Sequence, residues 1–321
     1  MSTKTVDLFK KINWKSSESI LLFVVIVLCV ALSFASPRFM TTDNIINIIR
    51  QMSFNGIIAI GMAIVIIGAG IDLSVGSIAA LTGVVFGFLS SVFNIPWAIA
   101  FVAALLAGTA VGALNGTIIA YLGIPSFIVT LGAQSILRGF NMLTTGGNPI
   151  SPLSPDFIVL GTGSLLGVPI PSIIFFALFI IGWICLNKTK LGRYIYASGD
   201  NAEAANVSGI NVKRVSMITF AISGFMAGAS GLIMTARLTT AVPNMGAGAE
   251  MDAIAAVCVG GISLYGGRGS LIGMLIGVAM MAIIRNGLNL LNVSTWWQLL
   301  IVGAILIVAV YFSTRSSSAR R

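Results

Sequence analysis

Long apolar runs recur along the chain, with a new run beginning about every 25 residues and short polar stretches between them. A transmembrane helix needs about 20 consecutive apolar residues, and most of the runs approach that length. The run at 251–264 is about two-thirds of that length, which predicts a half-helix or part of a broken helix. We therefore expect an all-α integral membrane protein. Its ten apolar segments are 20–34, 45–67, 74–93, 97–121, 125–143, 169–187, 214–236, 251–264, 270–290 and 296–312.

The composition supports a membrane protein rather than a soluble one. Hydrophobic residues make up 57% of the 321 residues and charged residues only 8%, and the mean hydropathy is +1.03. Soluble globular proteins carry about 25% charged residues. The number of segments and the composition together predict a chain that crosses the membrane many times.

The positions of the basic residues indicate how the chain is oriented. They concentrate in the N-terminal tail, in the loop 187–214 and in the tail 315–321, whereas the loop 144–168 has no Lys or Arg. Cytoplasmic loops carry an excess of Lys and Arg, so we expect all three basic stretches in the cytoplasm. Six segments precede the basic loop and four follow it, and both even counts agree with that orientation. The same rule explains the formal net charge of +9, and no nucleic-acid partner is expected.

These features predict one transmembrane domain at 20–312, with cytoplasmic tails at 1–19 and 313–321. The basic start followed by an apolar run also has the pattern of a secretory signal. Because membrane segments follow along the rest of the chain, an uncleaved first span is favoured. We expect the protein to lie in the bacterial cytoplasmic (inner) membrane, in contact with lipid, and both of its termini to lie in the cytoplasm.

The sequence lacks the residues of a catalytic or energy-coupling site. It contains no histidine and no Gly-Lys pair, so it has no phosphate-binding P-loop, and nothing resembles a nucleophile elbow or a metal-ligand cluster. We therefore expect no enzymatic activity, no cofactor and no metal in this chain. Ion-coupled carriers usually have more carboxylates inside the membrane than this chain does, so transport driven by another subunit is favoured. A secondary carrier and a passive channel remain open as alternatives.

The basic loop carries a local helix signal in LGRYIYASGDNAEAANVSGINVKRV (191–215). Asp200 followed three residues later by Glu203 has the spacing of a capping box, and Gly209 is a typical helix stop. We expect a short helix over Asn201–Ser208 outside the membrane. On this signal alone it is either a solvated connector or a docking element.

The chain resembles the permease subunit of bacterial ribose-type ABC sugar importers from about Pro37 to Phe312. The stretches that carry the resemblance are GIIAIGMAIVIIGAGIDLSVGSIAALTG, LGRYIYASGDNAEAANVSGINVKR and MDAIAAVCVGGISLYGGRGSLIGMLIG. Glu203-Ala204-Ala205 with Gly209 also matches the E-A-A…G element of binding-protein-dependent permeases, which docks on the ATPase.

This resemblance implies a fold like that of the cobalamin importer permease, a type II ABC permease. It implies a homodimer, or a heterodimer with a close relative, that works with a cytoplasmic ABC ATPase and a periplasmic sugar-binding protein. ATP and Mg would be bound by the ATPase. The residues implied in ATPase coupling, in the loop 188–214, are Asp200, Asn201, Glu203, Ala204, Ala205 and Gly209. Ribose, another pentose, a hexose or a related polyol all remain open as the substrate.

Asp72, in GAGIDLSVGS (68–77), is the one charged residue between Arg50 and Arg138. Span counting places it near the cytoplasmic end of the second segment. Ser74, Ser77 and the free N–H groups at the start of the next helix, around Gly76, can satisfy a carboxylate. We interpret Asp72 as a cap and hinge residue, with a role in gating as the alternative.

Two further groups of polar residues lie in or beside apolar segments. Uncharged side chains are candidates for lining the substrate path, although hydrogen bonding between helices is the simpler role. Arginines near the predicted external ends of their spans are candidates for docking the binding protein, with snorkelling to lipid headgroups as the alternative. The path candidates are Ser53, Asn55, Asn115, Gln134 and Asn141, and the docking candidates are Arg50, Arg138, Arg237 and Arg285.

Glycines at four-residue spacing form two stripes, at 108, 112 and 116 and at 269, 273 and 277. Small residues let helix backbones approach closely in a membrane. Packing within one subunit is the favoured interpretation, and a dimer seam is the alternative.

Overall fold

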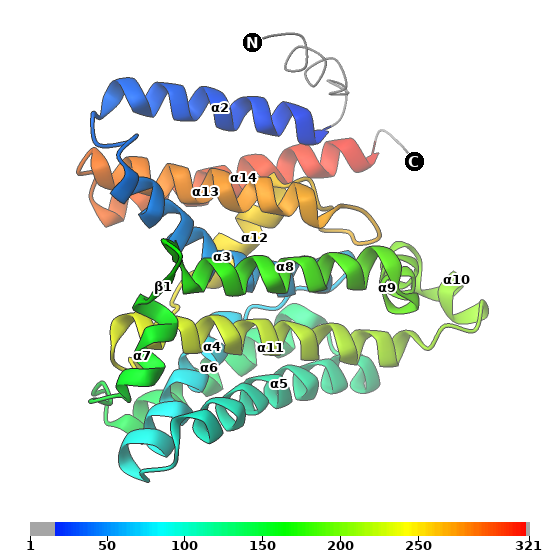
Figure 1. The fold of residues 1–321 in the computed structure, drawn as a ribbon. Coiled ribbons are helices and arrows are strands. Elements are labelled where there is room, and N and C mark those ends of the chain that lie inside the picture. Colours follow the sequence, from blue (N-terminus) through cyan, green and yellow to red (C-terminus); the bar gives the residue numbers. More distant parts are fainter. Residues whose placement is uncertain (1–16, 319–321) are drawn as a thin grey trace.

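The structure is a computed structural model that describes residues 17–318 (Figure 1). The described chain is helical apart from one short antiparallel hairpin. In chain order the elements are α2 (Ser17–Ala35), α3 (Thr42–Ile67), α4 (Val75–Gly87), the π-helical turn η1 (Phe88–Val92), α5 (Trp97–Leu122), α6 (Ser126–Thr145), α7 (Pro155–Thr162), β1 (Ser164–Leu165), β2 (Val168–Pro169), α8 (Ile170–Lys188), α9 (Lys190–Asp200), α10 (Ala202–Val207), α11 (Val212–Leu238), α12 (Ala249–Val259), α13 (Leu271–Leu290) and α14 (Thr295–Ser318).

Each of the ten predicted apolar segments coincides with a helix. Seven of the helices in the described chain are long and apolar enough to cross a membrane: α2, α3, α4 with η1, α5, α8, α11 and α13. Of the other three, α12 has only 11 residues, α14 is apolar over Thr295–Tyr311, and α6 carries several polar side chains. The chain is therefore an all-helical integral membrane protein, and the count of ten spans stays a prediction.

Most of the helices run across the molecule in roughly the same direction (Figure 1). One end holds α9, α10 and the loop 260–270, and we call it the α10 end. The opposite end holds α7 and the β1–β2 hairpin, and we call it the hairpin end. The start of α2 and the end of α14 both lie at the α10 end (Figure 1). Of the predicted tails, residues 1–16 and 319–321 lie outside the described residues, whereas residues 313–318 continue the helix α14.

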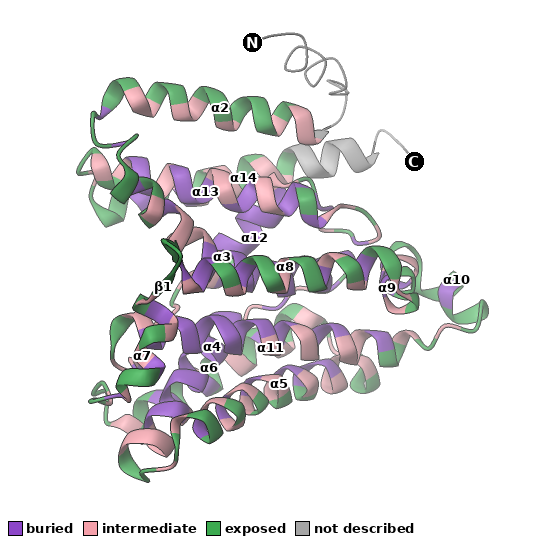
Figure 2. Cartoon of the chain, in the orientation of Figure 1, coloured by how far each residue is buried: buried purple, intermediate pink, exposed green. Residues whose placement is uncertain are grey.

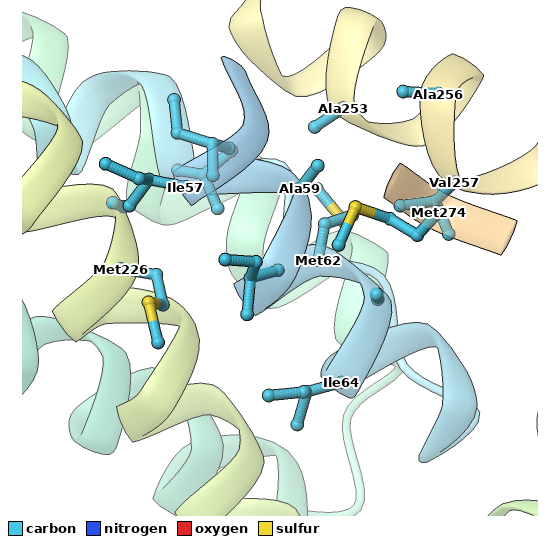
Figure 3. Close-up of a cluster of buried hydrophobic side chains, with 14 of the residues drawn as sticks. Ile57, Ala59, Met62, Ile64, Met226, Ala253, Ala256, Val257 and Met274 are labelled. Carbon is cyan, nitrogen blue, oxygen red and sulfur yellow. The ribbon is translucent and has the colours of Figure 1, made fainter. Parts of the chain in front are cut away.

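The core is built around the second half of α3, which is apolar on all sides. Every residue from Gly56 to Ile67 is buried, as expected for a helix surrounded by other helices (Figure 2). Ile57 and Met62 of α3 contact the core that α11, α12 and α13 complete, represented by Met226, Ala256 and Met274 in Figure 3. α2 lies at the periphery and packs on α13.

Both glycine stripes pack within the subunit. A Cβ atom added to Gly112 on α5 would overlap the carbonyl oxygen of Phe220 on α11, and one added to Gly277 on α13 would overlap that of Ala256 on α12. The favoured interpretation, packing inside one subunit, is therefore confirmed. Close backbone contact in each pair leaves no room for side chains at these positions.

Candidate functional site

The α10 helix begins at a side-chain cap, but the capping residue differs from the predicted one. The Oδ1 atom of Asn201 accepts a hydrogen bond from the backbone N–H of Ala204 at 2.9 Å. Asp200 is the last residue of α9, and the backbone becomes extended only at Asn201. The prediction that Asp200 caps this helix is therefore wrong. Glu203 lies in the first turn, where its negative charge is favourable near the helix N-terminus.

The predicted glycine stop is confirmed at the other end of α10. Gly209 has a φ of +85°, and its N–H donates to the carbonyl of Asn206 at 3.0 Å. The N–H of Ile210 returns to the carbonyl of Ala205, also at 3.0 Å. Glycine adopts this left-handed backbone conformation without the steric cost that other residues pay. The six-residue helix is thus closed at both ends by its own chain.

The α10 helix projects from the end of the molecule (Figure 1). All of its residues are exposed except Ala205, which faces its own chain and is 5% exposed. Ala204 therefore faces outward, whereas Ala205 packs inward, and the two alanines do not share a face. An open groove of about 620 Å³ runs between α10 and the start of α11, lined among others by Glu203, Asn206 and Lys213.

The helix before it, α9, attaches α10 to the membrane domain. The hydroxyl of Tyr196 on α9 donates to the carbonyl of Gly269 in the loop 260–270 at 2.8 Å. The same loop is tied to the end of α3, because the N–H of Gly267 donates to the carbonyl of Ile67 at 2.8 Å. Gly199 packs so closely that an added Cβ would overlap the carbonyl oxygen of Ile67. Burial raises the pKa of Tyr196 above its usual range, so its hydroxyl stays protonated at physiological pH.

The helix α9 is not among the elements predicted from the sequence, although its signals are present. Thr189 caps it by accepting from the N–H of Gly192 at 3.2 Å. The buried positions Gly192, Ile195 and Gly199 recur at three- and four-residue spacing, which is typical of one helix face. The buried positions are mostly glycine and serine (Gly192, Ser198 and Gly199), which weakens the apolar pattern. Together, α9 and α10 form a unit that contacts the C-terminal end of α3 and the loop 260–270.

Asp72 lies in the loop 68–74 that separates α3 from α4, and it is fully buried. Its Oδ1 accepts from the backbone N–H of Ser74 at 3.0 Å and from the Ser74 hydroxyl at 2.5 Å. Its Oδ2 accepts from the hydroxyl of Ser223 on α11 at 2.7 Å. Asn115 on α5 donates to the Ser74 hydroxyl at 3.1 Å. Asp72 thus bonds to Ser74, the residue before α4, but in the described chain it accepts from no N–H group of α4 itself. Its role as a cap and hinge residue stays a prediction.

Ser77 was expected to bond to Asp72 but does not. Its hydroxyl donates instead to the carbonyl of Ser74 at 2.8 Å. The backbone of the loop is satisfied by α6 instead. The Ser126 hydroxyl accepts from the N–H of Ile71 at 3.1 Å, and the Thr130 hydroxyl donates to the Ile71 carbonyl at 3.2 Å. Non-helical backbone inside a membrane protein needs such partners.

Two path candidates, Gln134 and Asn141, lie on the same face of α6 as Arg138. Gln134 donates from Nε2 to Oε1 of Glu250 at 2.9 Å, and Arg138 donates from Nη1 to the carbonyl of Met245 at 2.7 Å. Asn141 lies 3.5 Å from the carbonyl of Ser77. The structure therefore brings α6 against the starts of α4 and α12.

The other path candidates have separate positions. Ser53 on α3 bonds to Ser172 on α8 at 3.1 Å, Asn115 belongs to the Asp72 network, and Asn55 is half-buried. For Ser53 and Asn115 the structure shows hydrogen bonds between elements. The five path candidates do not form one cluster.

The docking candidates are half-buried, and three of them contact their own chain. Arg138 bonds to Met245 as described, Arg285 forms an ion pair with Asp252, and the Arg237 guanidinium lies 5.1 Å from the centre of the Phe54 ring. The role of these four arginines in docking stays a prediction.

Glu250 and Asp252 were not predicted from the sequence as site residues. Both lie in the first turn of α12 and are buried. Two carboxylates at the start of an apolar segment were a signal, because buried charges need cationic or hydrogen-bonding partners. Their partners come from α6 and α13, which no local pattern identifies.

Comparison with known proteins agrees with the permease resemblance. The family described as branched-chain amino acid transport system / permease component matches residues 44–310. The ribose import permease protein RbsC of Haemophilus influenzae is 43% identical, over 90% of this chain and 90% of that protein. The D-allose transport system permease protein AlsC of Escherichia coli K12 is 39% identical, over 90% and 89%. The xylose transport system permease protein XylH of Haemophilus influenzae is 34% identical, over 92% and 95%.

No solved structure matches the chain. The family match covers most of the residues, and it includes the loop 68–74, the α9–α10 unit and the face of α6 that contacts Glu250. The chain belongs to the family of branched-chain amino acid transport system permease components.

Proposed function

We propose that the chain is the membrane-spanning permease subunit of an ABC importer that moves a monosaccharide into the cytoplasm. The sugar would be delivered by a periplasmic binding protein, and separate ATPase subunits would supply the energy. Relatives named for the import or transport of ribose, allose and xylose support a sugar of five or six carbons as the substrate. The α10 end would then face the cytoplasm, and a second permease copy would complete a type II ABC permease with ten spans in each subunit.

The α9–α10 unit is the observation that carries this proposal. A permease without an ATP site needs a surface on which an ATPase acts. The α10 helix is short, closed by its own caps at both ends, and exposed on five of its six residues. Such a helix moves as a rigid body with its partner, whereas a flexible loop would absorb the motion.

The connection from α10 into the membrane domain supports the same role. Tyr196, Gly199 and Gly267 join α9 to the end of α3 and to the loop between α12 and α13. Each of these contacts lies just after the end of a buried helix, α3 in one case and α12 in the other. A movement of α10 would therefore act directly on the elements that surround the core.

Reconstitution tests this proposal. The permease would be placed in vesicles with its ATPase on the face that corresponds to the cytoplasm and the binding protein on the opposite face. Uptake of labelled D-ribose, D-xylose and D-allose would then be measured. We expect uptake of at least one sugar with ATP and none with a non-hydrolysable ATP analogue. Uptake without the ATPase, driven by an ion gradient or by the sugar gradient alone, would instead show a carrier or a channel.

A further inference from the structure

Three buried polar atoms around α6 have no protein partner within the described part of the chain. They are Nη2 of Arg138, Oδ1 of Asn141 and Oε2 of Glu250. Native structures leave few buried polar atoms unpaired, and each such atom calls for an explanation. Two of these atoms lie on one face of α6 and the third lies in the first turn of α12, and they form the clearest group of this kind in the described chain.

Each charged side chain in this group is half anchored and half free. Glu250 is 7% exposed, its Oε1 accepts from Gln134, and its Oε2 is the free atom. The Nη1 atom of Arg138 donates to the carbonyl of Met245, and its Nη2 is the free atom. The anchored atom fixes the orientation of each group, so the free atom is held in place before any ligand arrives.

The free atoms approach one bare position on the backbone. A Cβ atom added to Gly76 would lie 2.7 Å from Oε2 of Glu250 and 3.3 Å from Nη2 of Arg138. Although both side chains are described, no direct ion pair joins them. The same Cβ would lie 2.2 Å from the carbonyl oxygen of Gly246, so the backbone at Gly76 packs directly against both groups. A ligand therefore reaches them only where the elements around α6 separate.

The chemistry of these atoms is complementary to a hydroxyl group. A carboxylate oxygen accepts only, a guanidinium N–H donates only, and a hydroxyl both donates and accepts. A hydroxyl placed between them makes two charge-assisted hydrogen bonds, which are stronger than neutral ones. Asn141, one turn along α6 from Arg138, offers a further acceptor. One positive and one negative group together carry no net charge, which suits a neutral ligand.

We propose that Arg138, Glu250 and Asn141 form a contact site for the hydroxyl groups of a neutral polyhydroxylated substrate during its passage. This inference rests on the proposed function, because it names residues that would touch the transported sugar. α6 packs mainly on α4 and α5 and reaches α12 through side chains, so the site lies between elements that can separate. The path then includes charged groups, in contrast to the uncharged lining that the sequence analysis predicted.

The test measures sugar-dependent stabilisation of the full-length permease, purified in nanodiscs without ATPase or binding protein. Melting temperature would be recorded against D-ribose concentration, and against D-xylose and D-allose in parallel. We expect the sugar to raise the melting temperature of the wild type. Glu250→Gln keeps the shape of the side chain but replaces the free acceptor, so the half-maximal concentration should rise about tenfold, the effect of losing one hydrogen bond to a charged group.

Asp252→Asn is the matched control. It removes the same kind of charge two residues further along α12, but the carboxylate of Asp252 already has a partner, Arg285. It should lower the melting temperature without sugar and leave the half-maximal sugar concentration unchanged. The proposal is overturned if no sugar stabilises the wild type, if Glu250→Gln leaves the half-maximal concentration unchanged, or if L-leucine stabilises the wild type in place of the sugars. Because the assay contains no ATPase, its failure is distinct from a failure of ATP-driven uptake.

Discussion

The hydroxyl of Ser223 on α11 donates a hydrogen bond of 2.7 Å to Oδ2 of Asp72, a residue 151 positions earlier in the chain. The other carboxylate oxygen accepts from the N–H and the hydroxyl of Ser74, the residue immediately before α4. One buried side chain therefore fixes both where α4 begins and how the loop 68–74 sits against α11. This explains why a carboxylate is present in an otherwise apolar stretch.

Removing this carboxylate should destabilise the permease. Asp72→Ala leaves the Ser74 N–H and the hydroxyls of Ser74 and Ser223 without their acceptor in a fully buried place, and we expect a loss of about 3 kcal/mol. Asp72→Asn retains one acceptor oxygen and should lose less. Thermal unfolding of the purified variants measures both effects. A wild-type melting temperature for Asp72→Ala would contradict the cap interpretation, and a stable Asp72→Asn that no longer transports would assign Asp72 to gating.

The corrected cap of α10 gives a matched pair of variants. Asn201→Ala removes the side chain that accepts from the Ala204 N–H, which should cost the local helix about 1 kcal/mol and lower sugar-stimulated ATPase activity. Asp200→Ala changes the adjacent residue, which does not cap α10, and should leave that activity close to wild type. ATPase assays on reconstituted complexes compare the two directly. A larger loss in Asp200→Ala than in Asn201→Ala would restore the capping residue predicted from the sequence.

The tie between α9 and the loop 260–270 should be needed for coupling rather than for folding. Tyr196→Phe deletes the hydroxyl that donates to Gly269, and we expect uptake to fall while the protein remains folded and inserted. Tyr194→Phe is the control, because Tyr194 is exposed two residues earlier on the same helix. Since burial keeps the Tyr196 hydroxyl protonated, the difference between the variants should not change between pH 6 and pH 8, a range well below the ordinary tyrosine pKa of about 10. Equal uptake by the two variants would show that this contact does not contribute.

The α5–α11 contact should tolerate no side chain at its closest point. Gly112→Ala places a methyl group against the carbonyl of Phe220, so the helices must separate, and overpacking of this kind costs about 1–3 kcal/mol. Gly139→Ala on α6 meets no atom within 4 Å in the described chain and should be neutral or slightly stabilising. Melting temperatures of the two variants in detergent provide the measurement. The reverse order of stabilities would contradict packing of this stripe within the subunit.

Apolar length and spacing predicted the membrane helices well, because a lipid-spanning helix must be apolar over most of its length. The helix α10 was predicted from other local signals, a polar cap and the glycine stop at Gly209. It misplaced the cap by one residue because Asp200 and Asn201 are both good caps and only the backbone turn decides between them.

Contacts between distant segments were beyond the sequence pattern. The partner of Asp72 on α11 and the partners of Glu250 on α6 depend on how the helices pack, and no periodicity encodes that. The partners of Arg138 and Arg285, which are Met245 and Asp252, appear only in the folded chain.

The central claim is that α10 transmits the work of an ATPase to the sugar path, and it is tested most directly by the amounts of sugar imported and of ATP hydrolysed, together with their ratio. Both quantities would be measured on the same vesicles for the wild type, for Gly209→Val and for Ala205→Leu. Valine disfavours the left-handed backbone at residue 209, and leucine cannot fit where Ala205 packs inward. Gly209→Asn is the control, because asparagine tolerates that backbone conformation. The account predicts that the valine and leucine variants insert but lose sugar-stimulated hydrolysis and uptake, whereas Gly209→Asn keeps both. Full assembly with the ATPase and a wild-type ratio in the valine and leucine variants would contradict it.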